Sequence, residues 1–377
     1  MAERVSVNFF DPANLERKYG SQELYNLRAN EAVEEGLSYV QDQIRESKDP
    51  EKVFFGLYTL LADRRRLIAV EQNSSNKEEF GCLRLKPEHD RSGFAFTSLT
   101  GVYQSVGNTA LKRIVRLMDK LKDKKEGAFS QEIWGRKWTF QVEILDSKPG
   151  GNFVPILTHP RNYPPYMAEC FTREGRLPFR NRAHFLRLHS EDPEIYSRLE
   201  RTTITCILNA EYPSLPGERR IQRTKHIWAT LSMDIDGEKV PLAKFVTGAD
   251  SHETGASLEQ MRKDSIVYVV HQDFLYHEIT VVALSRLWGR IVTWKDRQAP
   301  LEELQADVAH LRFVFALAML SYRGDGAIGD WIERIAYQVN GLVFTPAEKT
   351  LLPFEPLAAV IPSFYEKDYP KTRSWNS

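Results

Sequence analysis

The sequence contains few cysteines and no long apolar run, and both absences restrict where the protein can work. Its three cysteines, Cys82, Cys170 and Cys206, lie far apart and are odd in number. This excludes a disulfide framework and the close spacing of a zinc site. No run of about 18 apolar residues is present, so we expect no membrane span. Residues 1–5 carry a charged pair and no apolar run, which argues against a secretory leader. Together these features predict a soluble, cytoplasmic protein.

The common motifs of phosphate, dinucleotide, zinc-protease and hydrolase chemistry are absent too. The sequence has no GxxxxGKS/T loop, no GxGxxG coupled to a strand, no HExxH and no GxSxG. No two histidines are spaced to share one face of a helix, so we predict no metal site from histidine. A magnesium site made by Asp325, Asp330 and the phosphate oxygens of a ligand is left open. ATP with Mg²⁺ is the cofactor that such a site would imply.

The overall composition is that of an ordinary folded protein. The chain has 377 residues, of which 42% are hydrophobic and 27% charged. Basic and acidic residues number 51 each, so the formal net charge is zero. The charge of the whole molecule therefore favours neither nucleic acid nor membrane.

The periodicity of apolar residues predicts an α+β fold with a helical N-terminal layer, a central β-rich body and a C-terminal helical hairpin. Two N-terminal helices are expected after the pairs Asp11-Pro12 and Asp49-Pro50, where aspartate caps the helix and proline takes its first position. A further helix is expected over 110–125, because its apolar residues recur every three or four positions.

Alternating or β-branched stretches predict the strands of the central body. The expected strands are 137–145, 201–208, 227–235, 240–246 and 266–270. Asp236-Gly237 predicts a hairpin between the third and the fourth. We assign residues 1–345 to a single α+β domain, with a sub-boundary near residue 130 left open. The proline- and aromatic-rich residues 346–377 have no helical period, and we predict an extended tail.

The most informative stretch is 301–342, where two apolar ladders of helical spacing flank a glycine-rich turn. Two helices joined by Gly324-Asp325-Gly326 form an αα-hairpin whose apolar faces must be buried. Arg323 and Arg334 flank this turn, and a helix beginning near Ala327 would direct its first N–H groups outward. A helix N-terminus with arginine is suited to phosphate. The alternative is that Asp325 caps the helix itself and Arg323 only ties down the turn.

A second informative stretch begins where the strand predicted at 266–270 ends. His271 comes at the strand end, and Glu278 lies one turn into the following helix. A histidine in that position is typical of the way α/β folds present acid–base chemistry, so His271 is the predicted general base or acid. The alternative is that His271 is a hydrogen-bonded structural residue.

Three basic segments support a different prediction, an RNA-binding surface. The helix predicted at 110–125 has a basic face, and arginines interleaved with aromatic residues gather at 173–187 and 219–225. Guanidinium groups bind phosphate and aromatic faces stack bases. The residues expected to bind RNA, or a charged tRNA used as a substrate, are Lys112, Arg113, Arg116, Arg180, Arg182 and Arg220. The alternative is that these side chains pair with the equally abundant acids. Whether the proline-rich loop at 155–178 is a lid is left open.

The turn Gly324-Asp325-Gly326, which we call the glycine corner, also resembles part of a known group of enzymes. The run Arg323-Gly-Asp-Gly-Ala-Ile is similar to the Arg-Gly-Ser-Ala corner of some bacterial effector and toxin enzymes. Among these are nucleotide-dependent transferases with a Ser-His-x-x-x-Glu signature. Ser251-His252 occurs upstream in the same order, but Ala256 stands in the place of the glutamate. The resemblance implies an enzyme that acts on a phosphate-bearing substrate with His252 near the phosphate, and the missing glutamate argues against adenylyl transfer.

These patterns lead to one main hypothesis and two alternatives. The main hypothesis is a transferase that acts on a nucleotide or another phosphate-bearing small molecule. In it Arg323 binds phosphate, His271 moves a proton, and Asp325 or Glu278 orients His271 or a metal. This requires His271 to lie near Arg323 and outside the packed core. The alternatives are the RNA-binding protein and an interaction protein without catalysis.

Overall fold

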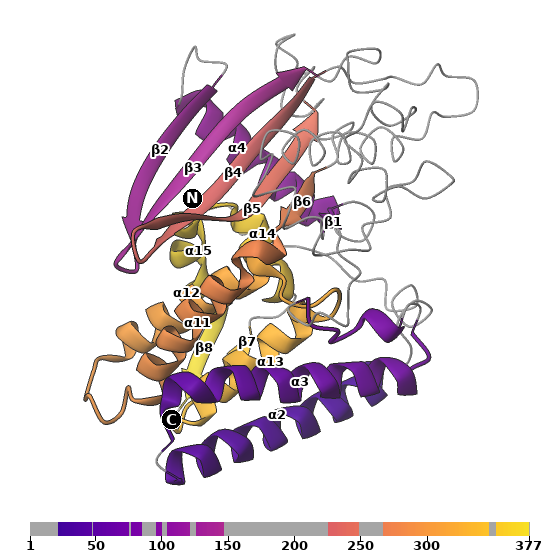
Figure 1. Cartoon of the computed structure of the whole chain (residues 1–377), viewed down its shortest axis with the longest axis vertical. Coiled ribbons are helices and arrows are strands. Elements are labelled where there is room, and N and C mark those ends of the chain that lie inside the picture. The colour runs from indigo at the N-terminus through magenta and orange to yellow at the C-terminus, as the bar shows by residue number, and fades with distance from the viewer. Residues whose placement is uncertain are drawn as a thin grey trace, which may run out of the picture.

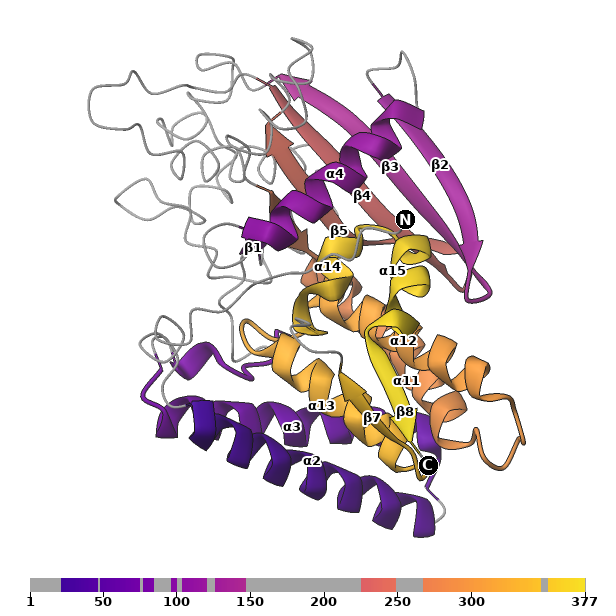
Figure 2. The ribbon, with the colours of Figure 1, turned by 180° about the vertical axis from the view of Figure 1, so that it is seen from behind.

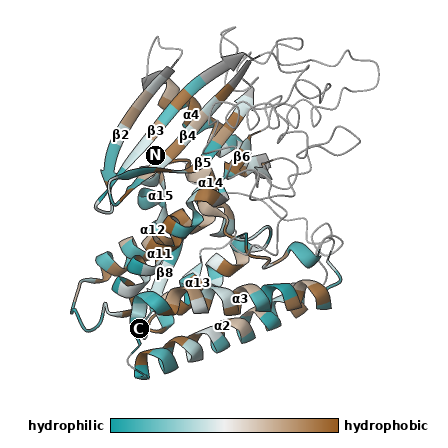
Figure 3. Cartoon of the chain, in the orientation of Figure 1, coloured by the Kyte–Doolittle hydropathy of each residue, from teal (hydrophilic) through white to brown (hydrophobic). Residues whose placement is uncertain are grey.

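The N-terminal part of the chain is a pair of antiparallel helices, α2 (Gln22–Arg45) and α3 (Pro50–Glu71), as predicted. A computed structural model of the chain describes residues 22–46, 48–74, 77–84, 96–99, 104–120, 126–146, 225–248, 267–346 and 352–376. Asp49 caps α3 by accepting a hydrogen bond from the backbone N–H of Glu51, and Pro50 follows it. Polar and apolar residues alternate around both helices (Figure 3), which is typical of helices with one buried face.

The central body is a six-stranded, entirely antiparallel sheet. Its strands, in chain order, are β1 (Phe96–Ser98), β2 (Glu126–Ile133), β3 (Arg136–Asp146), β4 (Lys225–Ile235), β5 (Glu238–Gly248) and β6 (Tyr268–His271). They lie in the order β1-β6-β5-β4-β3-β2. Helix α4 (Gln104–Lys120) crosses one face of this sheet (Figure 2).

The strong hairpin signal in the sequence is confirmed. Asp236 and Gly237 join β4 to β5 with φ angles of 54° and 85°, the left-handed pair that a tight hairpin needs. The strand ending at His271 is also confirmed. The predicted start of the next helix is wrong, because α4 begins at Gln104 rather than at residue 110. Its predicted end at 121–125 lies outside the described residues, and strand β2 was not predicted. Residue 130, where a sub-boundary was left open, lies inside β2.

A second group of helices lies beside the sheet and packs on α2 and α3 (Figure 1). A short 3₁₀ turn, η5 (Phe274–Tyr276), leads into α11 (His277–Val292). Next come α12 (Leu301–Ala318) and α13 (Asp325–Gln338), which form the predicted C-terminal hairpin. The apolar ladders of both helices are buried, including Leu304, Phe315 and Trp331. The fold is therefore α+β, with the three parts in the predicted order.

The prediction of an extended tail is wrong. After β7 (Val343–Pro346) come η6 (Leu352–Phe354), α14 (Glu355–Ala359), α15 (Pro362–Asp368), η7 (Tyr369–Lys371) and β8 (Arg373–Asn376). Strand β8 pairs with β7, and the two short helices lie between the sheet and the helical layer (Figure 2). Both helices are too short to show a period in sequence. Tertiary packing, rather than local propensity, stabilises elements of this length.

Several other predictions lie outside the described residues. They are the helix start at Asp11, the strand at 201–208 and the loop at 155–178. Among the helices that the structure does describe, none combines the length and the apolar character needed to cross a membrane.

Candidate functional site

The junction between sheet and helical layer brings together polar residues that are distant in sequence. We define the interlayer junction as Arg84, Thr97, His271, Leu317 and Asp325. These residues come from the segment after α3, from β1, from β6, from the end of α12 and from the start of α13. Two of them, His271 and Asp325, were predicted as site residues.

The segment 80–84 supports the glycine corner through its backbone. The N–H of Gly81 donates to the carbonyl of Arg323 at 2.9 Å, and the N–H of Tyr322 donates to the carbonyl of Cys82 at 3.0 Å. Gly81 has a φ of +64°, and an added Cβ would overlap the carbonyl oxygen of Ala62. Only glycine fits there, because the left-handed conformation and the close backbone approach coincide.

The C-terminal end of α12 is capped by side chains from other elements. The last carbonyls of a helix have no partner inside the helix. Here His271 Nδ1 lies 3.1 Å from the oxygen of Leu317, and Arg84 Nη1 donates to the oxygen of Met319 at 2.9 Å. Met319 itself has φ 47° and ψ 72°, a left-handed conformation that is uncommon for a residue other than glycine. His271 therefore joins the sheet to the end of α12, and Arg84 joins the segment after α3 to the same helix end.

The second ring nitrogen of His271 contacts a hydroxyl. Nε2 of His271 lies 2.8 Å from Oγ1 of Thr97. Because a carbonyl can only accept, Nδ1 must carry the proton that is donated to Leu317, and Nε2 of the neutral ring then accepts from the threonine hydroxyl. A hydroxyl, an imidazole and a group that fixes the tautomer are the three parts from which enzymes build proton-transfer chains.

Burial keeps His271 neutral. Desolvation lowers the pKa of His271 to about 4, against the hydrogen bond to Leu317, which raises it, and the nearby charge of Arg84 lowers it further. Arg84, His271 and Asp325 are buried, with exposed fractions of 4%, 6% and 4%. The main hypothesis required His271 to lie outside the packed core, and the structure does not meet this condition.

Asp325 does not act as the cap of α13. Gly324 is the capping residue, with φ 98°, and Asp325 occupies the first helical position. Its carboxylate accepts from the N–H of Ser321 at 2.9 Å, from the hydroxyl of Ser321 at 2.5 Å and from the hydroxyl of Tyr58 at 3.3 Å. Burial raises the pKa of Asp325 to about 6, although these hydrogen bonds lower it. Asp325 therefore orders the corner and does not contact the ring of His271.

The two arginines that were predicted to bind phosphate point to different neighbours. Arg323 pairs with Glu79 at 2.5 Å, and Arg334 donates to Oδ1 of Asn30 on α2 at 2.9 Å. Glu278 lies exposed in the first turn of α11. The structure thus does not bring Arg323, Arg334 and Glu278 together with His271, as the original hypothesis required.

The glycines of the corner are explained by packing. The run 324–329 has GxGxxG spacing, but it follows helix α12 rather than a strand of the sheet. A Cβ on Gly324 would lie 2.8 Å from Cγ of Arg65, and one on Gly326 would lie 2.9 Å from Cβ of Pro353. At Gly329 it would overlap the guanidinium of Arg312. Side chains of this protein therefore occupy the space beside each glycine, so close packing accounts for the glycines at these positions.

Both aspartates of the magnesium site that was left open have partners within the protein. Asp330 pairs with Nη2 of Arg312 at 2.6 Å, while Asp325 is occupied by Ser321. Over the part of the chain that the structure describes, His, Cys, Asp and Glu form no group of three that could hold a metal ion.

One predicted RNA-binding residue has a structural role instead. Arg113 on α4 donates to the carbonyl of Ala358 at 2.8 Å and to Asp368 at 2.5 Å. Arg116 is exposed and Lys112 is half-buried. Arg180, Arg182 and Arg220 lie outside the described residues, so the structure describes only the α4 part of the predicted RNA surface. His252, predicted to bind phosphate, also lies outside them.

The sequence did not single out Arg84 and Thr97. Arg84 sits in the alternating run Leu83-Arg84-Leu85, which looks like an ordinary strand, and Thr97 lies in a strand of three residues. Neither pattern carries a chemical signal, because the partners of both residues are more than 170 positions away.

No protein-family model matches the sequence, and no curated protein is similar to it.

Proposed function

We propose that the protein is a soluble, cytoplasmic enzyme that transfers a group from a nucleotide or another phosphate-bearing substrate, and that the interlayer junction is its site. The observation that carries this proposal is the chain Thr97–His271–Leu317, with distances of 2.8 and 3.1 Å. It supports proton transfer because the tautomer of the imidazole is fixed and its Nε2 lone pair faces a hydroxyl.

His271 would act as the proton acceptor in this scheme. A substrate hydroxyl that takes the place of Thr97 would give its proton to Nε2, while its oxygen attacks the phosphorus and the leaving group departs with its electron pair. Arg84 supplies positive charge beside this position, which favours a phosphate-bearing substrate. Asp325 and Ser321 hold the corner that accepts Arg84 and take no part in proton transfer.

The roles first given to Arg323, Arg334 and Glu278 are not part of this proposal. Arg323 pairs with Glu79, Arg334 contacts α2, and Glu278 is exposed on α11. The cysteine pattern, three residues far apart in sequence, suits a reducing cell interior.

A thermal-shift scan against ATP, GTP, NAD, Mg²⁺ and bulk tRNA is the first test. A ligand at a hundredfold excess over Kd raises stability by about 2.7 kcal/mol, which is several degrees. A nucleotide-specific shift supports the proposal. A shift with tRNA alone that disappears as salt rises supports the RNA alternative instead. No shift with any nucleotide contradicts the nucleotide form of the proposal, and the scan is then repeated with phosphorylated sugars and inorganic phosphate, whose failure contradicts the rest.

Turnover of the nucleotide that binds then tests His271 directly. His271→Asn is expected to keep the thermal shift and lose roughly 100- to 10,000-fold in kcat, the range for a positioned base. His310→Asn is the matched control, because His310 is also buried but stacks on Trp134, 5.0 Å between ring centroids, beside β3. Equal losses in both variants would assign His271 to packing alone.

A further inference from the structure

The interlayer junction must open before a substrate can reach it. Arg84, His271 and Asp325 are all buried, and the hydroxyl of Thr97 occupies the acceptor nitrogen of His271. The sheet and the helical layer meet here through few bonds: His271 and the N–H of Gln272 both donate to the oxygen of Leu317. Separation of the two layers would break the contact of His271 with Leu317 and expose Arg84 together with the His271–Thr97 pair, which stays intact because β1 and β6 are neighbours in the sheet.

The C-terminal segment, residues 355–376, connects the same two layers at another place. Helix α14 packs on α4 of the sheet layer and on α12 of the helical layer, and α15 packs on α12. Arg113 of α4 adds the bonds to Ala358 and Asp368. Phe313 of α12 stacks on Tyr365 with ring centroids 5.4 Å apart. This segment thus contacts both sides of the interface that would have to open.

One arginine fixes the end of this segment. Arg373 of β8 is completely buried and donates to both oxygens of Glu333 on α13, at 2.5 and 3.2 Å. It also donates to Glu355 at 2.9 Å and lies 3.9 Å from the ring centroid of Tyr369. The hydroxyl of Tyr369 donates to Glu333 at 2.7 Å. Three hydrogen bonds to carboxylates and one ring contact therefore depend on a single guanidinium.

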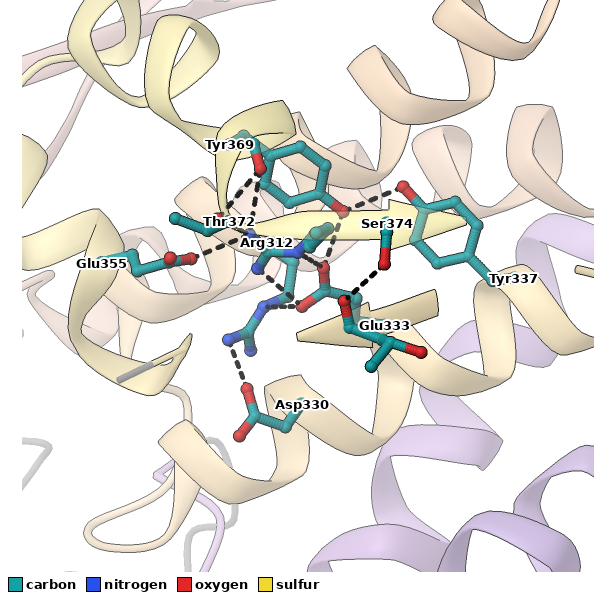
Figure 4. Close-up of polar contacts among 10 residues, drawn as sticks. Arg312, Asp330, Glu333, Tyr337, Glu355, Tyr369, Thr372 and Ser374 are labelled. Carbon is teal, nitrogen blue, oxygen red and sulfur yellow. Dashed lines mark hydrogen bonds and ion pairs between the residues drawn. The ribbon is translucent and has the colours of Figure 1, made fainter. Parts of the chain in front are cut away.

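Because of the charged cluster around Arg373, the C-terminal segment 355–376 is expected to be either fully docked on the helical layer or fully released. Glu333 is fully buried and also pairs with Arg312 at 3.0 Å, and Arg312 reaches Asp330 (Figure 4). Removal of one partner from such a cluster leaves a buried charge without its counter-charge, which is strongly unfavourable. A partly docked segment would have that defect, so intermediate positions are disfavoured.

Both connections contain a strained residue. Val360, between α14 and α15, has φ 67°, which is rare for a β-branched side chain, and Met319 at the end of α12 has φ 47°. Such conformations persist only where the surrounding structure imposes them. Release of the segment and opening of the junction would each relieve one of them.

We propose that residues 355–376 are a latch: docked through Arg373, they keep the sheet and the helical layer closed over the interlayer junction, and their release opens it. The latch would regulate the same site as the proposed function and rests on that proposal. Its physical test, however, requires no substrate.

Thiol labelling of Cys82 measures the opening, because Cys82 is half-buried between Gly81 and Arg84. The protein would carry Cys170→Ser and Cys206→Ser, so that only this thiol reacts. Arg373→Gln is expected to raise the labelling rate by about tenfold or more and to speed hydrogen exchange across 355–376 and at the N–H of Gln272. Lys371→Gln is the matched control, since Lys371 lies on the same segment and pairs with Asp368 at the surface.

Two results would overturn the latch. In the first, the segment exchanges fast in Arg373→Gln while Cys82 and Gln272 stay protected, so that the segment and the junction are independent. In the second, the segment itself stays protected. If Arg373→Gln does not fold, Glu333→Gln with Arg373→Gln removes both charges together and is read in the same way. A protein with no nucleotide turnover but normal latch behaviour would contradict the proposed function alone.

Discussion

The Nδ1 atom of His271 lies 3.1 Å from the carbonyl oxygen of Leu317, so the last residue of β6 caps the last turn of α12. This contact ties the sheet to the helical layer and fixes which ring nitrogen carries the proton. A residue predicted from sequence as catalytic therefore has a definite structural role.

Acid is expected to destabilise the protein through His271. Its pKa is lowered from 6.5 to about 4, so the folded state favours the neutral ring. The preference for the neutral ring adds about 3 kcal/mol to the free energy of unfolding. This stabilisation is complete above pH 6.5 and is lost as the pH falls towards 4. Urea unfolding of the wild type and His271→Gln at pH 7 and pH 4.5 measures it. Because His310 also has a lowered pKa, of about 3, the variant should retain part of the slope. An unchanged slope would contradict this assignment.

Asp325 is expected to act in the opposite direction. Its pKa is raised from 3.8 to about 6, so the folded state favours the protonated acid. That contribution is present below pH 3.8 and is lost as the pH rises through 6. Relative to the wild type, Asp325→Asn should gain about 3 kcal/mol of unfolding free energy between pH 4 and pH 7. A difference that is constant with pH would mean that the carboxylate is ionised throughout.

Two glycines with nearly the same backbone angle should differ sharply on substitution. Gly81 has φ +64° and Gly135 has φ +66°. The Cβ of Gly135→Ala would meet no atom within 4 Å. This variant should therefore lose only about 1–2 kcal/mol of stability, the cost of a left-handed backbone at alanine. Gly81→Ala adds the overlap with Ala62 and should leave little folded protein. Thermal unfolding of both variants tests the pair, and similar melting temperatures would contradict the close approach.

Neutralising Glu333 should cost much more than neutralising a surface glutamate. Glu333→Gln leaves the two arginines of the buried cluster short of one counter-charge, and about 3–5 kcal/mol is expected. Glu31→Gln removes an exposed pair with Arg28 and should cost less than about 1 kcal/mol. Urea unfolding gives both numbers. A cost below about 1 kcal/mol for Glu333→Gln would mean that the cluster adds nothing to stability.

Arg113 and Arg116 share one helix and distinguish structure from binding. Arg113→Gln removes the bonds to Ala358 and Asp368 and should lower the unfolding free energy by about 1–3 kcal/mol. Arg116 is exposed, so Arg116→Gln should stay within about 0.5 kcal/mol of the wild type. If Arg116→Gln nevertheless weakens tRNA binding in a salt-dependent way, the RNA alternative gains its first support.

Where a pattern was long, it predicted the fold well. The ladders of α3, α12 and α13, the hairpin at Asp236-Gly237 and the strand ending at His271 all have the predicted type and place. The errors fall on short or ambiguous segments. Strand β2 has no clear alternation in sequence, and α14 and α15 have five and seven residues, which is too few for a period.

The candidate site could be predicted only in part. His271 and Asp325 were found because each stands at the end of a regular element, where side chains are presented for chemistry. Arg84 and Thr97 were missed because their roles depend on contacts across the whole chain. Arg323 and Arg334 were grouped because both flank the glycine-rich turn in sequence. They face different neighbours, because Arg323 lies before α13 and pairs with Glu79, whereas Arg334 lies within α13 and contacts Asn30 of α2.

By itself the sequence determined the class, the order of the layers and the glycine corner, because periodicity and the left-handed preference of glycine are local properties. Only the tertiary structure decided what each glycine makes room for, which carbonyl His271 meets and that the C-terminal residues dock through Arg373. Those outcomes depend on the low dielectric of a shared interior. There a charge or a helix end must find its partner wherever in the chain that partner lies.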